Sequence, residues 1–214
     1  MLRYAITDRT LLTSDPRQQP EVLLQQIAAW ASPHRSEPIH FIQLREKDLS
    51  PAKLSSLTRQ IITMLRTTAS STRLLLNASS ASGHGIDIAL AGAAHGVHLT
   101  STTFLSANEV RARFTAAGLQ PPILTVSCHT LAEVEAAHQQ HLDAILFAPV
   151  FQKNVPNQTL PGIGLTRLHE ACRLAVPTPV LALGGITPQN TQSCLDAGAA
   201  GIAAIRLFCT SPSE

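Results

Sequence analysis

Short apolar segments alternate with longer segments of helical periodicity along the whole chain, and this alternation constrains the fold more than any other feature. Short apolar runs bounded by polar stretches are typical of strands that are buried on both faces. The predicted strands are residues 2–7, 39–45, 73–77, 96–99, 123–127, 144–150, 179–183 and 201–205. The predicted helices are residues 20–33, 50–69, 80–93, 106–117, 130–141, 164–175 and 187–197.

Local signals mark the ends of several predicted helices. Ser50 is a capping residue that is followed by proline, which favours the first position of a helix. Thr130 precedes Glu133 by three residues, and this spacing predicts a reciprocal capping box. Gly118 and Gly198 stand where two helices should end.

Strict alternation of strands and helices implies parallel strands, because each helix returns the chain to the start of the next strand. Eight strands in a chain of 214 residues favour a closed TIM (β/α)₈ barrel over an open sheet. An open doubly wound sheet is the alternative. No linker or low-complexity segment divides the sequence, so residues 1–214 are expected to form a single domain.

The end of the sequence departs from this pattern. Only six residues follow Phe208, so the helix that should follow the eighth strand is expected to be truncated. Such a truncation would leave part of the outer wall of the barrel bare. A second copy of the chain could cover it, which makes a homo-oligomer an expectation, and a bare wall without a partner is the alternative.

Composition excludes several classes of protein. Hydrophobic residues make up 44% and charged residues 14%, and the formal net charge of +2 predicts no nucleic-acid partner. The four cysteines form no C-x-x-C pair, so neither a zinc site nor a disulfide framework is expected. No apolar run is long enough to span a membrane, and the N-terminus lacks a secretory signal. A cytoplasmic location is therefore expected.

In barrels of this kind the functional residues gather at the carboxyl ends of the strands. Gln43, Arg45 and Lys47 end the second predicted strand, and a period of two places them on one face. Three long polar side chains on an inward face are unfavourable in a core unless they meet a ligand or a buried carboxylate. The alternative is that Arg45 and Lys47 pair with acidic neighbours at the rim.

The next strands also end in polar residues. Asn77 ends the third strand, and Ser127 and His129 end the fifth. His129 is the candidate general acid or base, because imidazole titrates near neutral pH. The alternative is that His129 only caps the next helix or binds a backbone carbonyl.

The strongest local signal is the pair Gly184-Gly185, which follows the seventh strand and opens a helix. Two glycines allow backbone amides to approach an anion, and the N-terminus of a helix favours negative charge. The small residues Ala203 and Ala204 on the eighth strand keep a pocket open, and Arg206 can bind phosphate. The alternative is a tight turn without a ligand.

Segments in this order resemble those of the thiamine phosphate synthase/TenI family. They are Tyr4-Ala5-Ile6-Thr7-Asp8, Gln43-Leu44-Arg45-Glu46-Lys47, Asn77, Gly96-Val97-His98-Leu99, Ser127-Cys128-His129-Thr130, Phe147-Ala148-Pro149-Val150-Phe151, Ala182-Leu183-Gly184-Gly185-Ile186 and Gly201-Ile202-Ala203. The resemblance covers nearly the whole chain. It implies a TIM barrel that binds a small phosphorylated heterocycle.

The family contains two chemistries, and the resemblance is incomplete for one of them. The synthase joins a pyrimidine pyrophosphate to a thiazole phosphate, and two acids of its pattern hold Mg²⁺ on the pyrophosphate. Those positions are Ala78 and Thr103 here, and the lysine of the synthase loop is displaced to Lys153. TenI-like proteins instead isomerise a thiazole carboxylate phosphate to its aromatic tautomer. The retained residues favour the TenI-like reaction without a cofactor.

Three hypotheses follow from the resemblance. In the first, an isomerase uses His129 as the catalytic residue, binds substrate through Gln43, Arg45, Lys47, Asn77, Ser127 and Lys153, and binds phosphate through Gly162, Gly184, Gly185, Ala203, Ala204 and Arg206. In the second, the chain is a thiamine phosphate synthase with relocated Mg²⁺ ligands. In the third, it is a non-catalytic regulator that binds a thiazole phosphate.

Overall fold

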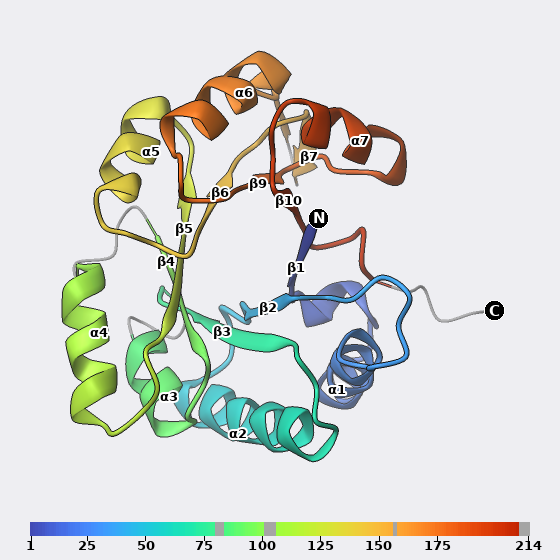
Figure 1. Ribbon diagram of the computed structural model, residues 1–214. Helices are drawn as coiled ribbons and strands as arrows, with labels where there is room; N and C mark the ends of the chain where they lie inside the picture. The colour runs from blue at the N-terminus through green and yellow to red at the C-terminus, as the bar shows by residue number, and fades with distance from the viewer. Residues whose placement is uncertain (80–83, 101–105, 156–157, 210–214) are drawn as a thin grey trace.

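A closed ring of parallel strands forms the centre of the computed structural model, which describes residues 1–79, 84–100, 106–155 and 158–209 (Figure 1). Neighbouring strands pair in the order β1-β10-β9-β6-β5-β4-β3-β2. The barrel strands are β1 (Leu2–Ile6), β2 (Phe41–Leu44), β3 (Arg73–Asn77), β4 (Gly96–Leu99), β5 (Ile123–Cys128), β6 (Ala144–Phe147), β9 (Val180–Leu183) and β10 (Gly201–Ala204). The predicted TIM barrel is confirmed, and the open sheet is wrong.

Helices surround this ring in Figure 1. They are α1 (Gln19–Trp30), α2 (Pro51–Thr67), α3 (Gly85–Ala91), α4 (Ala107–Ala116), α5 (Leu131–His138), α6 (Gly164–Leu174) and α7 (Pro188–Asp196), and a 3-10 turn, η1 (Arg9–Leu11), follows β1. The Ser50 side chain caps α2, and Thr130 and Glu133 form the predicted capping box of α5. Part of the helix predicted at 80–93 lies outside the described residues.

The connection after β6 corrects one expectation. No element was predicted between the strand at 144–150 and the helix at 164–175, but this segment contains the strands β7 (Lys153–Val155) and β8 (Gln158–Leu160), which pair antiparallel as a separate two-stranded sheet. Each strand has only three residues, so a period of two leaves too little pattern to recognise in the sequence.

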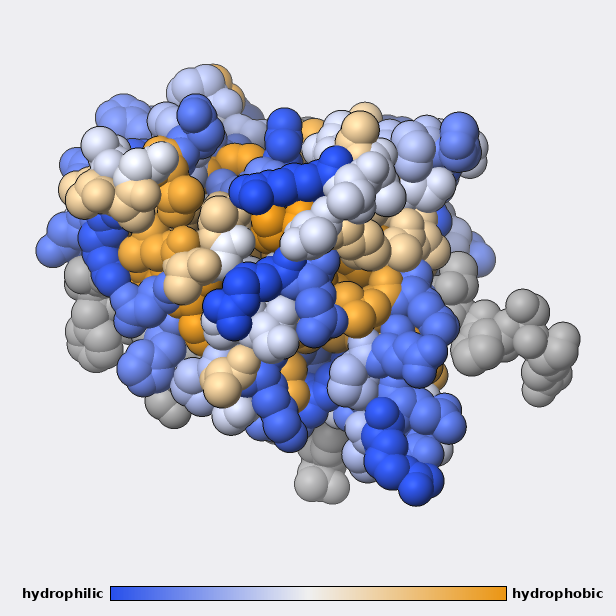
Figure 2. Space-filling view, turned by 90° about the horizontal axis from the view of Figure 1, so that it is seen from below, coloured by the Kyte–Doolittle hydropathy of each residue, from blue (hydrophilic) through white to orange (hydrophobic). Residues whose placement is uncertain are grey.

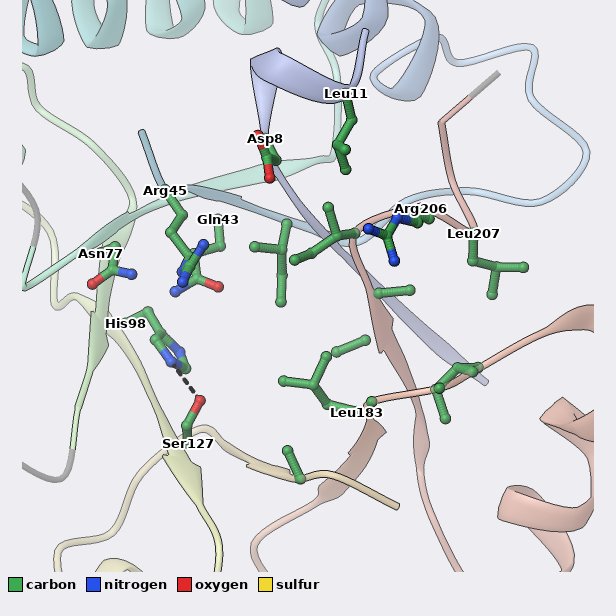
Figure 3. Close-up of a pocket in the computed structure, with 18 of the residues that line it drawn as sticks. Asp8, Leu11, Gln43, Arg45, Asn77, His98, Ser127, Leu183, Arg206 and Leu207 are labelled. Atoms are coloured by element: carbon green, nitrogen blue, oxygen red, sulfur yellow. Dashed lines mark hydrogen bonds between the residues drawn. The ribbon is translucent and has the colours of Figure 1, made fainter. Parts of the chain in front are cut away.

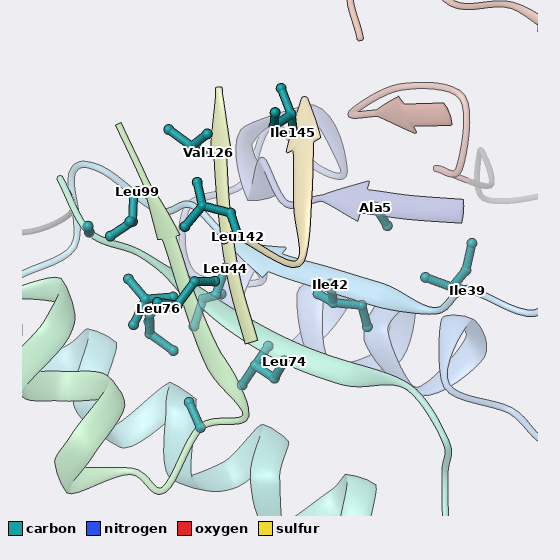
Figure 4. Close-up of a cluster of buried hydrophobic side chains, with 14 of the residues drawn as sticks. Ala5, Ile39, Ile42, Leu44, Leu74, Leu76, Leu99, Val126, Leu142 and Ile145 are labelled. Carbon is teal, nitrogen blue, oxygen red and sulfur yellow. The ribbon is translucent and has the colours of Figure 1, made fainter. Parts of the chain in front are cut away.

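The hydrophobic core has two layers because successive strand residues point to opposite sides of the barrel wall. The small inner layer consists of Tyr4, Ile6, Ala144, Leu146, Leu181 and Ala203. The larger outer layer lies between the strands and the helices, and Figure 4 shows part of it, including Leu44, Leu76 and Leu99. Burying such a leucine side chain contributes about 1.5–3 kcal/mol, so the outer layer supplies most of the hydrophobic stabilisation.

The outer wall beside β10 is covered, contrary to expectation. Residues 205–209 form a turn and no helix, yet the outward side chains Ile202 and Ala204 are buried. The indole Nε1 of Trp30 in α1 donates to the carbonyl oxygen of Phe208 at 2.7 Å, and both residues are buried. The last described residues therefore fold back against α1 and close the wall without a second copy of the chain.

Figure 2 views the molecule from below Figure 1, where hydrophilic side chains cover much of the surface and hydrophobic ones show between them. Within the described residues, no helix combines the length and the apolar character that crossing a membrane requires.

Candidate active site

A cavity of about 790 Å³ opens at the carboxyl ends of the barrel strands. Figure 3 shows that its wall has two unlike sides. Polar side chains from β2 to β5 lie on one side, among them Gln43, Asn77 and Ser127. Leu183 and Leu207 lie on the other side, together with the guanidinium group of Arg206. Such a pocket suits a small ring that carries charged or polar substituents on one side.

Most of the predicted site residues line this cavity. They are Gln43, Arg45, Lys47, Asn77, Ser127, His129, Gly184, Gly185, Ala203, Ala204 and Arg206. Gly162 is not among the lining residues, and a Cβ atom there would lie 2.5 Å from the Val150 oxygen. Its small size therefore serves a close backbone approach, and its contact with phosphate stays a prediction. Lys153 begins β7, and its side chain lies outside the described part of the structure.

The acids beside Arg45 and Lys47 are already paired with another cation. The Arg9 guanidinium donates to Glu46 at 2.9 Å and to Asp48 at 2.5 Å, and Glu46 is buried. Within the described residues, no ion pair involves Arg45 or Lys47, so the predicted alternative of rim pairing is wrong. Arg45 lowers the pKa of Lys47, because two nearby cations repel each other. The pair therefore favours an anionic ligand.

Of the two acid positions in the synthase pattern, the one that the structure describes supplies no magnesium ligand. Magnesium prefers carboxylate oxygens, but Ala78 replaces the acid of the synthase pattern and is packed in the core. Glu46 binds Arg9, and Asp8 accepts hydrogen bonds within the turn that follows it. No cluster of three His, Cys, Asp or Glu side chains occurs among the described residues. Thr103 lies outside them.

His129 stands after β5 in a defined tautomer. Its Nδ1 lies 2.7 Å from the carbonyl oxygen of Ala148, which can only accept, so Nδ1 carries the hydrogen. The backbone contact that sequence reasoning held as an alternative is therefore present. It leaves Nε2 with the lone pair that a general base needs, and the side chain lines the cavity.

The turn between β9 and α7 exposes backbone amides. Gly184 and Gly185 have φ angles of +96° and +67°, which side chains other than that of glycine rarely permit. Neither the Gly185 nor the Ile186 amide donates to an acceptor within the described residues. Both amides precede α7, whose N-terminus adds favourable partial charge. This turn has the geometry of an anion-binding site.

One lining residue, His98, was noticed in the sequence but was not assigned to the site. It lies on β4 beside Thr125 of β5, its ring is buried, and its Nε2 is 3.0 Å from the Ser127 hydroxyl oxygen (Figure 3). Burial, with a smaller contribution from Arg45, lowers the pKa of His98 to about 3. His98 is therefore neutral at physiological pH. A signal for it was present, because a histidine between two apolar residues on a predicted strand must find a polar partner.

The neutral His98 makes folding stability depend on pH. An unfolded histidine has a pKa near 6.5, so below that pH the unfolded chain binds a proton that the folded chain refuses. This contribution is complete above about pH 6.5 and declines as the pH falls toward 3. We expect roughly 2 to 3 kcal/mol less stability at pH 4.5 than at pH 7 from this residue, measured by urea unfolding.

The control for this measurement is His98→Gln, because glutamine does not titrate. Burial also lowers the pKa of His95, to about 4, so His95 destabilises the wild type and the variant equally in acid. The difference between the two proteins in how stability changes with pH therefore isolates His98. Equal losses of stability in the two proteins would contradict the assignment.

The fold and the site together define a TIM barrel whose cavity, at the carboxyl ends of its strands, suits an anionic small molecule. A family model described as thiamine monophosphate synthase matches residues 3–208. The chain belongs to this family, that of thiamine phosphate synthase and TenI, and is an enzyme of thiamine biosynthesis.

Individual relatives agree with this family. A protein of Aquifex aeolicus named "Putative thiamine-phosphate synthase 2" is 32% identical over 207 residues, which are 96% of each chain. The thiamine-phosphate synthase of Methanoregula boonei is 32% identical over 173 residues, 80% of this chain and 73% of that one. The solved thiamine phosphate pyrophosphorylase from Pyrococcus furiosus has a TM-score of 0.70 at 24% identity, covers 95% of this chain and 85% of its own, and shows the fold alone.

These names bear on the reaction expected from the sequence. They are names of the synthase, and none of the three is that of an isomerase. The comparisons therefore favour the synthase, which sequence reasoning held as the alternative, over the TenI-like isomerase that it preferred.

Proposed function

We propose that this enzyme binds a thiazole phosphate and isomerises its ring by proton transfer at His129. The observation that carries the choice of reaction is Ala78, a buried methyl group at a position where the synthase pattern has a magnesium-binding acid. A leaving pyrophosphate carries several negative charges that need neutralisation as the bond breaks. An isomerisation has no leaving group and does not need that cation.

The phosphate of the ligand is proposed to lie at the turn before α7. The Gly185 and Ile186 amides have no acceptor in the described structure and can donate to phosphate oxygens. Arg206 lines the cavity on the same side (Figure 3) and supplies a full positive charge. The heterocycle then extends over Leu183 toward the polar side of the cavity.

The second anionic group of the ligand, a carboxylate, is proposed to face Arg45 and Lys47. These cations have no ion-pair partner among the described residues, so a ligand carboxylate would neutralise them. With the phosphate at the opposite end of the cavity, the two charges orient the ring. Gln43 and Asn77 stand on the polar side and can donate to it.

Proton transfer is assigned to His129. Its Nε2 takes a proton from one carbon of the ligand, the double bonds shift toward the aromatic ring, and a proton is delivered to another carbon. The bond from Nδ1 to Ala148 stabilises the imidazolium that forms, because the carbonyl oxygen accepts from the charged ring. No atom is gained or lost in this reaction.

The test is an absorbance assay on the non-aromatic tautomer of a thiazole carboxylate phosphate. The proposal expects enzyme-dependent formation of the aromatic product, at a rate that a metal chelator does not change. A protein that only binds the ligand would show thermal stabilisation, about 2.7 kcal/mol at a ligand concentration one hundred times Kd, without turnover. That outcome would support the regulator and contradict the proposal.

The second candidate is thiamine phosphate synthase, which the names of the relatives and the description of the family favour. Its test is thiamine phosphate formation from a pyrimidine pyrophosphate and a thiazole phosphate at saturating Mg²⁺. Product that depends on magnesium would establish this reaction. The complete absence of product, with the isomerase assay positive, would dismiss it.

A further inference from the structure

A network of hydrogen-bonded polar side chains extends through the interior of the barrel to the cavity. The Tyr4 hydroxyl lies 3.1 Å from the Thr125 Oγ1, and Thr125 lies 2.8 Å from Nδ1 of His98. Tyr4 is also 3.3 Å from the same Nδ1, and Nε2 of His98 is 3.0 Å from the Ser127 Oγ. Three strands, β1, β4 and β5, contribute to this network.

Counting hydrogens excludes one tautomer of His98. If Nδ1 carries the hydrogen, it donates to Thr125. The hydroxyl groups of Tyr4 and Thr125 can then form only one hydrogen bond with each other, so only one of their two hydrogens is used. One of them then has no acceptor among the described residues. Tyr4 and Thr125 are each 0% exposed, so this hydrogen is also without water.

The other tautomer satisfies every hydrogen. Tyr4 donates to Thr125, Thr125 donates to the bare Nδ1, and Nε2–H donates to the Ser127 oxygen. The low pKa of His98 agrees with this arrangement, because the ring stays neutral and keeps one bare nitrogen. An unpaired buried hydroxyl makes the first tautomer less populated by roughly tenfold or more.

We propose that Tyr4 and Thr125 are positioning residues that hold His98 in the Nε2–H tautomer, so that Ser127 accepts from His98 and presents its own hydrogen to the ligand. Ser127 lines the cavity, and one lone pair of its oxygen accepts from His98, so its own hydrogen points away from that ring. With that hydrogen turned toward the cavity, the favoured ligand atom above Ser127 is an acceptor, such as an unprotonated ring nitrogen or a carboxylate oxygen.

The Ser127 hydroxyl differs from the other polar groups of the cavity because its hydrogen is directed toward the ligand. The amides of Gln43 and Asn77 carry both donors and acceptors, so they accept either kind of ligand atom. A hydroxyl whose hydrogen is turned toward the ligand favours an acceptor over an N–H or O–H group at the same place. Only the identity of the ligand rests on the proposed function, since the tautomer is a property of the free protein.

The direct experiment is nitrogen-15 NMR of the full chain with labelled histidine, in which two-bond correlations show which ring nitrogen carries hydrogen. His98→Gln assigns the signals among the nine histidines. We expect a bare Nδ1 and a protonated Nε2 for His98 across the neutral pH range. The opposite pattern would overturn the proposal, and this result is independent of any activity.

A matched pair of variants tests the cause. Thr125→Ser retains the hydroxyl and should keep the wild-type His98 signals. Tyr4→Phe combined with Thr125→Val removes the Thr125 donor to Nδ1 and the Tyr4 hydroxyl that orients it, and should shift the signals toward a mixture of tautomers. With a thiazole phosphate that isomerises, this double variant should raise KM about tenfold, as an unpaired polar group at the ligand would.

Unchanged His98 signals in the folded double variant would show that Tyr4 and Thr125 do not set the tautomer. If that variant fails to fold, the wild-type spectrum still decides the assignment. A wild-type protein with the expected tautomer but no turnover would contradict the proposed function and leave the His98 tautomer established.

Discussion

Replacing His129 with alanine is expected to lower kcat of the isomerisation by about 10²–10⁴-fold, the usual contribution of a positioned general acid or base. The hydrogen bond to Ala148 already orients the imidazole, so little conformational entropy is lost when Nε2 accepts the proton. Alanine removes the proton acceptor and leaves the phosphate-binding turn unchanged. KM should therefore change much less than kcat.

The control is His34→Ala, because His34 is exposed and is not among the residues that line the cavity. Its kinetics should match those of the wild type. Undiminished turnover in His129→Ala would remove the role assigned to His129. Equal losses in both variants would point to a general effect of histidine replacement on folding.

The Gly185→Ala variant is expected to lose both stability and phosphate binding. Its φ of +67° is strained for alanine, and the new Cβ would lie 2.6 Å from the Gln152 oxygen and 2.7 Å from Cβ of Phe151. The turn must move to relieve this crowding, and its amides then point away from the phosphate. We expect KM to rise more than tenfold and the unfolding free energy to fall by about 2–4 kcal/mol.

Gly118→Ala separates the two causes of this effect. Gly118 has nearly the same φ, +68°, but a Cβ there would meet nothing within 4 Å. That variant should lose only the backbone contribution of about 1–2 kcal/mol and keep its KM. If Gly185→Ala behaves like Gly118→Ala in urea unfolding and in KM, the turn before α7 does not bind the phosphate.

Much of the architecture could be predicted because its signals are local. The strands β3 and β4 were predicted at the bounds that the structure has, since each is a short apolar run that polar residues delimit. Strand-end residues such as Arg45, Ser127 and His129 follow from the barrel geometry alone. The glycine pair at 184–185 was recognisable because its chemistry depends on the backbone.

The features that were missed depend on pairs of residues distant in the sequence. The contact that closes the outer wall joins Trp30 to Phe208, 178 positions apart. The tautomer of His98 depends on Thr125 of the next strand and on Tyr4 across the barrel. The ion pair between Arg9 and Glu46 likewise could not be predicted from the sequence, and it leaves Arg45 without an acidic partner among the described residues.

The names of the relatives favour the synthase, whereas the residue at position 78 favours the isomerase. Identity of about 32% is spread over the whole barrel, so it follows the fold and the family closely. The reaction is decided by a few side chains at the strand ends. In the proposed function Ala78 is one of them, and a single replacement there has little influence on overall similarity.

Solvent deuterium tests the central claim most directly. The purified enzyme would be incubated in D₂O with the non-aromatic thiazole carboxylate phosphate and a metal chelator, and the product would be analysed by mass spectrometry. Proton transfer through His129 predicts rapid formation of an aromatic product that contains solvent deuterium. No product above the buffer blank, from a preparation that makes thiamine phosphate with Mg²⁺, would contradict the account.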